Sequence, residues 1–343
     1  MEKIKKILIT GGAGFIGSHT AVALAESGFE PVIIDDLRNS DISVLKGIAK
    51  ITGKKPLFFQ GNCCDLVFLE SVSGQVGPID GVIHFAALKA VGESVAKPLE
   101  YYRNNLDSLL AILEWMRTQN VQNLIFSSSA TVYGDPQKLP LTENDPRKEA
   151  SSPYGNTKKI AEDIIFDVTK SKSFPLKAAL LRYFNPIGAH PSARIGELPL
   201  GTPNNLIPYL TQAAAQKRGP LTVFGNDYPT PDGSGVRDYI HVMDLAEAHV
   251  ATLSFLLQKD SKAIFCSAFN VGTGNGTSVL ELIAKFEKET GVKVPYSIGP
   301  RRNGDVAACW ADATKMAREV GWHAKRSVSE ALRDAWRWEK SRK

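Results

Sequence analysis

Short runs of apolar residues recur along the first half of the chain, and helix-length amphipathic segments separate several of them. The runs are apolar throughout rather than at every second residue, which is typical of parallel strands covered on both faces. The predicted strands span residues 7–9, 32–34, 57–59, 82–85, 124–127 and 178–182. The predicted helices between them span 18–27, 99–119 and 154–170. This alternation predicts an α/β fold with a Rossmann-type, doubly wound parallel sheet.

The pattern changes after residue 185. Proline and glycine become frequent, and residues 225–235 form a turn-rich stretch. Further on, the pattern predicts helices over 244–257 and 279–290 and a short strand over 269–272 that rejoins the first sheet. We therefore expect a first domain over 1–185, with returning segments from about 240–272, and a smaller C-terminal α/β lobe over 186–343.

Composition narrows the class of protein. With 43% hydrophobic and 22% charged residues, the 343-residue chain is typical of a globular protein with a substantial core. The net charge of +5 comes largely from lysines and arginines near the two ends, so we expect no nucleic-acid partner. No apolar run reaches membrane-spanning length and no signal peptide is evident. The four cysteines show neither metal-ligand spacing nor a disulfide framework, so we expect no metal and a cytoplasmic protein.

A glycine-rich turn follows the first predicted strand. Gly11, Gly14 and Gly17 recur every three residues and lead into a helix, whose free N–H groups and dipole favour a pyrophosphate. The second strand ends in Asp35, 18 residues after Gly17. An acid at this point binds the ribose hydroxyls of an adenosine and repels a 2′-phosphate, so the pattern predicts NAD rather than NADP.

A second group of candidate residues follows the fifth strand. Ser129 and Thr131 lie at the end of this strand, and Tyr154 and Lys158 begin a later helix. Because Tyr154 and Lys158 are four residues apart, their side chains share one helix face. A neighbouring ammonium and the cationic nicotinamide ring of the bound cofactor both lower the pKa of a phenol from about 10, so Tyr154 is predicted to act as a base.

These motifs resemble those of the extended short-chain dehydrogenase/reductase superfamily. Within it, the chain is similar nearly end to end to the UDP-galactose 4-epimerase family. The runs that carry the resemblance are 10–19, 84–94, 126–135, 180–190, 224–244 and 304–312. The resemblance implies an NAD-dependent isomerase that inverts C4 of UDP-hexoses through a 4-keto intermediate and keeps NAD bound.

The resemblance also implies roles for individual residues. Tyr154 takes the proton of the sugar 4-hydroxyl, Lys158 holds the nicotinamide ribose, and Ser129, with Thr131, binds the C4 oxygen. The implied cofactor contacts are Gly11, Gly14, Phe15, Ile16, Gly17, Asp35, Asn39, Asn62, Phe85, Ala86, Lys89, Asn104, Ser127, Tyr154, Lys158 and Tyr183. Asn62 departs from the family, which commonly has an aspartate there that accepts from the adenine amino group.

The substrate contacts come from the same resemblance. They are Ser129, Tyr154, Phe184, Asn185, Asn205, Leu206, Phe224, Arg237, Tyr239, Arg302, Asp305 and Cys309. Among them, Arg237 and Arg302 pair with the diphosphate, which suits the forked geometry of arginine. Cys309 occupies a position where a bulky tyrosine restricts the family to plain hexoses. The small cysteine therefore predicts acceptance of UDP-GalNAc and UDP-GlcNAc as well.

Two alternatives remain open. One is a sugar-nucleotide 4,6-dehydratase of the same superfamily, although the Asp-Glu pair typical of such enzymes is missing after Thr131. The other is a non-catalytic NAD-sensing protein, because a fold alone does not determine function. The family also implies a homodimer that uses helices of the first domain.

Overall fold

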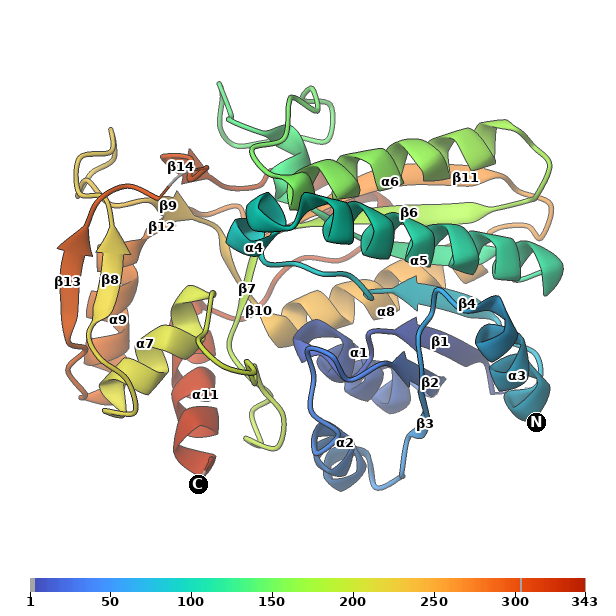
Figure 1. Ribbon diagram of the computed structural model, residues 1–343, viewed down its shortest axis with the longest axis horizontal. Helices are drawn as coiled ribbons and strands as arrows, with labels where there is room; N and C mark the ends of the chain where they lie inside the picture. Colours follow the sequence, from blue (N-terminus) through green and yellow to red (C-terminus); the bar gives the residue numbers. More distant parts are fainter. Residues whose placement is uncertain (1–3, 303, 343) are drawn as a thin grey trace.

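The structure of the protein is a computed structural model that describes residues 4–302 and 304–342. Its centre is a seven-stranded parallel sheet in the order β11-β6-β5-β4-β1-β2-β3 (Figure 1). Its strands are β1 (Lys6–Thr10), β2 (Glu30–Asp35), β3 (Leu57–Gln60), β4 (Gly81–His84), β5 (Asn123–Ser129), β6 (Lys177–Tyr183) and β11 (Phe265–Val271). The order reverses between β1 and β4, where such sheets bind ligands. The predicted Rossmann-type α/β fold is confirmed.

Helices cover both faces of this sheet. One face packs against α3 (Leu66–Val76), α5 (Pro98–Thr118) and α6 (Pro153–Lys170), and the short α4 (Val91–Ala96) contacts α5 and α6. The opposite face packs against α1 (Phe15–Glu26), α2 (Val44–Thr52), α8 (Val242–Leu257) and α10 (Thr314–Val320). Because both faces are covered, the central strands β1, β2, β4, β5 and β6 are buried along most or all of their length, as their continuous apolar runs predict, whereas the edge strand β3 is only partly buried.

A second, smaller lobe lies at the left of Figure 1. Its apolar core brings together α7 (Leu206–Ala214), β8 (Leu221–Phe224), α9 (Val279–Thr290) and α11 (Val328–Ser341). Short strands form small sheets that are separate from the first one, in the orders β10-β7, β12-β9-β14 and β13-β8. They are β7 (Asn185–Ile187), β9 (Val236–Arg237), β10 (Tyr239–His241), β12 (Thr277–Ser278), β13 (Tyr296–Gly299) and β14 (Ala308–Cys309). The chain passes between the lobes several times, since α8 and β11 return to the first sheet.

The structure extends the predicted elements. The strand expected over 269–272 is longer, running from Phe265 to Val271, and it pairs with β6. The helices α2, α3, α4, α7, α10 and α11 lie outside the predictions. Some of them carry start signals in the sequence: α11 begins with a capping box in which Ser327 and Glu330 each bond the backbone of the other. No helix in the described part of the chain is long and apolar enough to span a membrane.

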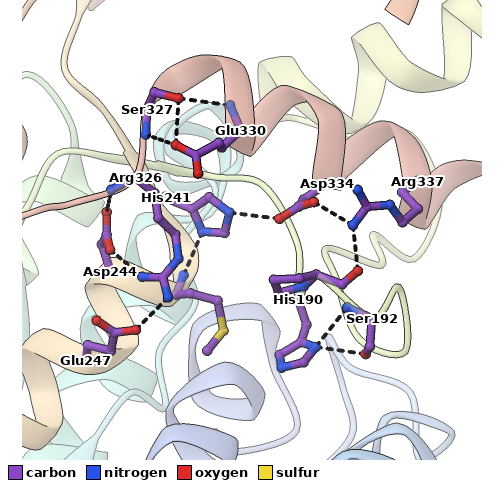
Figure 2. A network of polar contacts seen from close by, with 12 residues as sticks. His190, Ser192, His241, Asp244, Glu247, Arg326, Ser327, Glu330, Asp334 and Arg337 are labelled. Carbon is purple, nitrogen blue, oxygen red and sulfur yellow. Dashed lines mark hydrogen bonds and ion pairs between the residues drawn. The ribbon is translucent and has the colours of Figure 1, made fainter. Parts of the chain in front are cut away.

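A polar network fastens α11 to the rest of the molecule (Figure 2). Asp334 on this helix meets Nε2 of the buried His241 at 3.3 Å. Arg337, one turn further on, donates to the carbonyl oxygen of Pro191 at 2.6 Å. Arg326, just before the helix, pairs with Asp244 of α8 at 2.5 Å. The last helix thereby holds both α8 and the 188–205 loop, which leads from β7 to α7.

Candidate active site

A cleft of about 450 Å³ lies beyond the carboxyl ends of the parallel strands. Residues directly following or ending four strands line it, among them Gly11, Asp35, Phe85 and Ser129. Segments of the second lobe around Arg237 and residues 304–306 form the other wall. This position follows from the topology, because the strand order reverses at β1 and leaves a crevice there.

The glycine turn shapes one end of the cleft. Gly11 has a φ of +68°, and a Cβ atom on it would lie 2.9 Å from the amide nitrogen of Ala86. A Cβ on Gly17 would overlap the carbonyl oxygen of Gly11. Gly14 is the N-cap of α1 and offers no side chain to its first N–H groups. The helix therefore presents free donors at a point where only bare backbone fits, which suits a pyrophosphate.

Asp35 is fixed beside this turn. Its Oδ2 accepts from the amide of Ala13 at 3.0 Å, and its Oδ1 accepts from the amide of Leu37 at 2.9 Å and the hydroxyl of Ser40 at 2.7 Å. These donors fix the carboxylate in the wall of the cleft. A carboxylate oxygen has room for more than one donor, so Asp35 can also accept from the hydroxyls of a ribose. The turn and this acid together fit the adenosine diphosphate half of NAD.

At the adenine end of the cleft, the predicted contact of Asn62 with adenine is weakened, and two further residues that the sequence does not reveal line the wall. The carbonyl oxygen of Asn62 accepts from the amide of Cys64 at 3.0 Å, so only its second lone pair remains for an adenine. Arg38 also lines this end and donates to Oδ1 of Asn104 at 3.1 Å. This bond joins the loop after β2 to α5. Arg38 and Cys64 carry no motif that would have revealed them, because only the fold brings them to the cleft.

The hydroxyl cluster lies where β5 and α6 approach each other. Ser152 caps α6 by accepting from the amide of Gly155 at 3.2 Å, and this start places Tyr154 in the first turn. Thr131 donates to the hydroxyl oxygen of Ser129 at 3.0 Å. A hydrogen bond with Ser129 in turn lowers the pKa of Tyr154. Tyr154, Ser129 and Thr131 therefore form a linked row of hydroxyl groups on the cleft wall.

Lys158 lies one turn behind Tyr154 and is buried. Its Nζ donates to the carbonyl oxygen of Ser127 at 2.6 Å and lies 4.9 Å from the centre of the Phe126 ring. Burial lowers the pKa of Lys158 to about 7. Burial raises the pKa of Tyr154 to about 12, because its hydrogen bond with Ser129 offsets only part of the desolvation.

In the protein chain by itself the ammonium of Lys158 does not lower the pKa of Tyr154, so the predicted lowering depends on the charge of the nicotinamide ring. The reason is geometric: the ammonium of Lys158 is directed at Ser127 and lies 6.0 Å from the centre of the Tyr154 ring. A further positive charge is needed close to the phenol before Tyr154 can act as a base near neutral pH.

The second lobe brings two arginines to the other wall. Arg302 donates from Nη2 to Oδ1 of Asp305 at 2.8 Å, and Nη2 of Arg237 lies 3.9 Å from the same oxygen. One carboxylate thus faces two guanidinium groups and leaves a net positive charge in the cleft. Cys309 on β14 pairs with Arg237 on β9, which places it beside this pair. Burial raises the pKa of the Cys309 thiol to about 11, so the thiol is neutral.

Three predicted substrate contacts do not line the cleft. Tyr239 is buried in the apolar core of the second lobe, and Leu206, the first residue of α7, packs against the same core. Phe224 is exposed at the end of β8, where the guanidinium of Arg302 lies 5.6 Å from the centre of its ring. Alternation along one strand would place residues 237 and 239 on the same face. Tyr239 instead belongs to a separate strand, β10, which pairs with β7, whereas Arg237 belongs to β9, which pairs with β12 and β14.

All other predicted site residues line the cleft. On the cofactor side they are Gly11, Gly14, Phe15, Ile16, Gly17, Asp35, Asn39, Asn62, Phe85, Ala86, Lys89, Asn104, Ser127, Lys158 and Tyr183. On the substrate side they are Ser129, Thr131, Tyr154, Phe184, Asn185, Asn205, Arg237, Arg302, Asp305 and Cys309. One cleft therefore contains a dinucleotide-binding turn, a row of hydroxyl groups and a pair of arginines.

Comparison with known proteins gives the same picture. The family model described as GDP-mannose 4,6 dehydratase matches residues 8–335. UDP-glucose 4-epimerase of Bacillus subtilis is 52% identical over 335 residues, which cover 98% of this chain and 97% of that protein.

Solved structures agree over the full length. UDP-glucose 4-epimerase from Stenotrophomonas maltophila, with bound NAD and formylated UDP-arabinopyranose, has a TM-score of 0.94 and 48% identity, and the match covers 98% of each chain. The enzyme from Bifidobacterium longum, in complex with NAD+ and UDP, also has a TM-score of 0.94, with 46% identity over 98% of this chain and 99% of that one. The dehydratase model describes a wider group, whereas these relatives match half of all residues. The chain belongs to the UDP-glucose 4-epimerase family.

Proposed function

We propose that this protein interconverts UDP-galactose and UDP-glucose by inverting C4 of the hexose, with NAD bound in the glycine-turn end of the cleft. The observation that carries this proposal is the row formed by Tyr154, Ser129 and Thr131, which faces the same cleft as the glycine turn and the arginine pair. Family membership supports the reaction, and the relatives with bound NAD support the cofactor.

The chain's own groups suit the proton transfer of this reaction. NAD bound beside this row of hydroxyl groups would supply a reversible hydride acceptor for C4, and its positively charged ring would favour the phenolate of Tyr154. Tyr154 takes the proton of the 4-hydroxyl and later returns it, while Ser129 and Thr131 orient the C4 oxygen. Lys158 donates to the carbonyl oxygen of Ser127, and when its amine is protonated it places a positive charge near the phenol of Tyr154.

The second lobe is proposed to grip the nucleotide. Arg237 and Arg302 face the cleft on either side of Asp305 and bind the diphosphate, since guanidinium groups pair well with phosphate oxygens. Asp305 binds the uridine ribose, and Asn185 and Asn205 contact the phosphates or the sugar. A firm grip on the nucleotide leaves the hexose free to turn over between the two hydride transfers.

Cys309 is proposed to widen the range of substrates. It lines the cleft beside Arg237, and its side chain is small and uncharged. The space left by a cysteine admits an N-acetyl group at C2 of the hexose. The proposed substrates therefore include UDP-GalNAc and UDP-GlcNAc.

A homodimer in the cytoplasm completes the proposal. Exposed apolar side chains lie along α4 and α5, with Val95 at 62% and Leu99 at 83% exposure and Leu110 about three turns further along α5. A second copy of the chain would cover them. The four cysteines are free, which agrees with a reducing compartment.

The decisive experiment uses the purified protein without added NAD. UDP-galactose and UDP-GalNAc are incubated with it separately, and the products are followed by NMR. Formation of UDP-glucose and UDP-GlcNAc, with no net oxidation, is the expected result. A 4-keto-6-deoxy sugar would identify a dehydratase instead, and binding of NAD without conversion of either sugar would favour the non-catalytic NAD-sensing protein.

A further inference from the structure

We infer that Glu197 is a positioning residue that links the two walls of the cleft: it orients Asn205 on the nucleotide side and faces Lys89 on the cofactor side. This inference rests on the proposed function and adds a residue that no motif of the sequence singled out. Glu197 lies in the 188–205 loop, outside the regular elements. It acts through its neighbours and is not a catalytic residue.

The contacts of its carboxylate carry the inference. Oε1 of Glu197 accepts from Nδ2 of Asn205 at 2.5 Å, and Nζ of Lys89 lies 3.9 Å from the same oxygen. The Glu197 side chain is only 13% exposed, whereas Asn205 and Lys89 both line the cleft. Burial raises the pKa of Glu197, while Lys89 and Asn205 oppose this rise. Lys89 and Asn205 are therefore the two groups that stabilise the charged carboxylate of Glu197.

The start of α7 provides an independent observation. Asn205 is its N-cap, has the extended backbone of a capping residue and belongs to the residue types preferred there. Its side chain nevertheless makes no cap bond to the helix. The bond to Glu197 explains this, because the amide is turned away from the helix axis. As a result, the first N–H groups of α7 keep no side-chain cap and remain open to an anion.

The backbone that carries Glu197 is held firmly. The indole of Trp338 donates to the carbonyl oxygen of Glu197 at 3.0 Å, and Arg337 donates to Pro191 in the same loop. Figure 2 shows the neighbouring part of this anchoring, from α11 through Arg337 and Asp334. Both contacts to the loop are made by backbone oxygens. Replacing the Glu197 side chain therefore removes the contacts with Asn205 and Lys89 and leaves the anchor to α11 in place.

This arrangement predicts where the effect of Glu197 appears. When the carboxylate of Glu197 is removed, the side chain of Asn205 is free to cap α7. The nucleotide then loses both the Asn205 amide and the open N–H groups at the start of α7. Binding of the uridine diphosphate part should weaken, whereas the row of Tyr154, Ser129 and Thr131 is untouched. The KM for UDP-galactose should rise while kcat changes less than about twofold, the pattern of lost uniform binding.

The experiment compares Glu197→Leu and Glu197→Gln in the NAD-loaded enzyme. We expect Glu197→Leu to raise the Kd for UDP, measured by calorimetry, and the KM for UDP-galactose by about tenfold, the scale of one hydrogen bond to a charged group. Glu197→Gln keeps an acceptor for Asn205 and should cost about threefold, because a neutral hydrogen bond is about half as strong. Glu319→Leu, which removes a carboxylate bonded to its neighbour Arg318 on α10, serves as the matched control.

A double-mutant cycle separates positioning from general stability. In an Asn205→Ala background, Glu197→Leu should add less than about twofold to the Kd for UDP, because the partner it orients is gone. An equal effect in both backgrounds, or an unchanged Kd for UDP in Glu197→Leu, would overturn the inference. Since every comparison starts from a wild-type enzyme that epimerises UDP-galactose, failure here is distinct from failure of the proposed function.

Discussion

The ammonium nitrogen of Lys158 lies 6.0 Å from the centre of the Tyr154 ring, one turn away on the same helix. The two side chains converge on one region, as their spacing predicts, yet the ammonium donates to a backbone carbonyl and not to the phenol. Lys158 therefore influences Tyr154 through space. The phenol depends on its hydrogen bond with Ser129 and on charge brought by a bound ligand.

Removing the phenolic oxygen tests the role of Tyr154. Tyr154→Phe should lower kcat for UDP-galactose by at least about 100-fold, because the proton of the 4-hydroxyl loses its acceptor. The NAD content of the purified variant, read from its absorbance after denaturation, should match that of the wild type. Tyr209→Phe, on α7 away from the cleft, should keep full activity. Wild-type turnover in Tyr154→Phe would contradict the assignment.

The buried lysine predicts a pH-dependent stability. The pKa of Lys158 falls from 10.5 to about 7 on folding. Between these pH values the unfolded chain binds more protons than the folded protein, so the contribution of Lys158 to the free energy of unfolding rises with pH. From pH 7 to 9 the cofactor-free wild type should gain about 2 kcal/mol in free energy of unfolding relative to Lys158→Met. Urea titrations at both pH values measure this. An identical pH dependence in the two proteins would show that Lys158 keeps its ordinary pKa.

Cys309 predicts a change of substrate range. Cys309→Tyr should abolish conversion of UDP-GalNAc, because the larger ring fills the space for the N-acetyl group, and should spare UDP-galactose. NMR of both reactions measures the ratio of the two rates. Cys309→Ser, similar in size, should keep both activities. Equal loss of the two reactions in Cys309→Tyr would contradict the proposed role.

The arginine pair predicts a binding defect. Arg237→Met should raise the KM for UDP-galactose by about 10- to 100-fold, the loss of a hydrogen bond between charged groups, with NAD retention unchanged. Arg301→Met is the matched control, because Arg301 is exposed and its guanidinium bonds Asp227 at 2.7 Å. Steady-state kinetics of both variants decide the question. An unaltered KM in Arg237→Met would exclude this side chain from the phosphate site.

The sequence predicts the parallel sheet, the glycine turn and the row of hydroxyl groups well, because each is encoded locally. A strand followed by Gly11 or by Ser129 carries its own signal, and parallel strands bring their ends together. The helix α11 was not predicted, although Ser327 and Glu330 mark its start with a capping box.

Other parts of the site depend on contacts between distant segments. Glu197 meets Lys89 and Asn205 only after the 188–205 loop has packed against α11, and no spacing rule connects these three residues. The inward direction of Tyr239 likewise depends on the register of a three-residue strand. The raised pKa of Tyr154 follows from burial, which the spacing of Tyr154 and Lys158 does not encode.

The late position of β11 in the sequence has a consequence for the nascent chain on the ribosome. It pairs along the whole length of β6, yet it follows β6 by more than eighty residues. Until Phe265–Val271 has been synthesised, β6 presents a long, apolar, unpaired edge, which is the kind of surface that recruits other strands. The sheet therefore closes late in synthesis, and a fragment that ends after β6 should aggregate although it already contains the entire glycine turn.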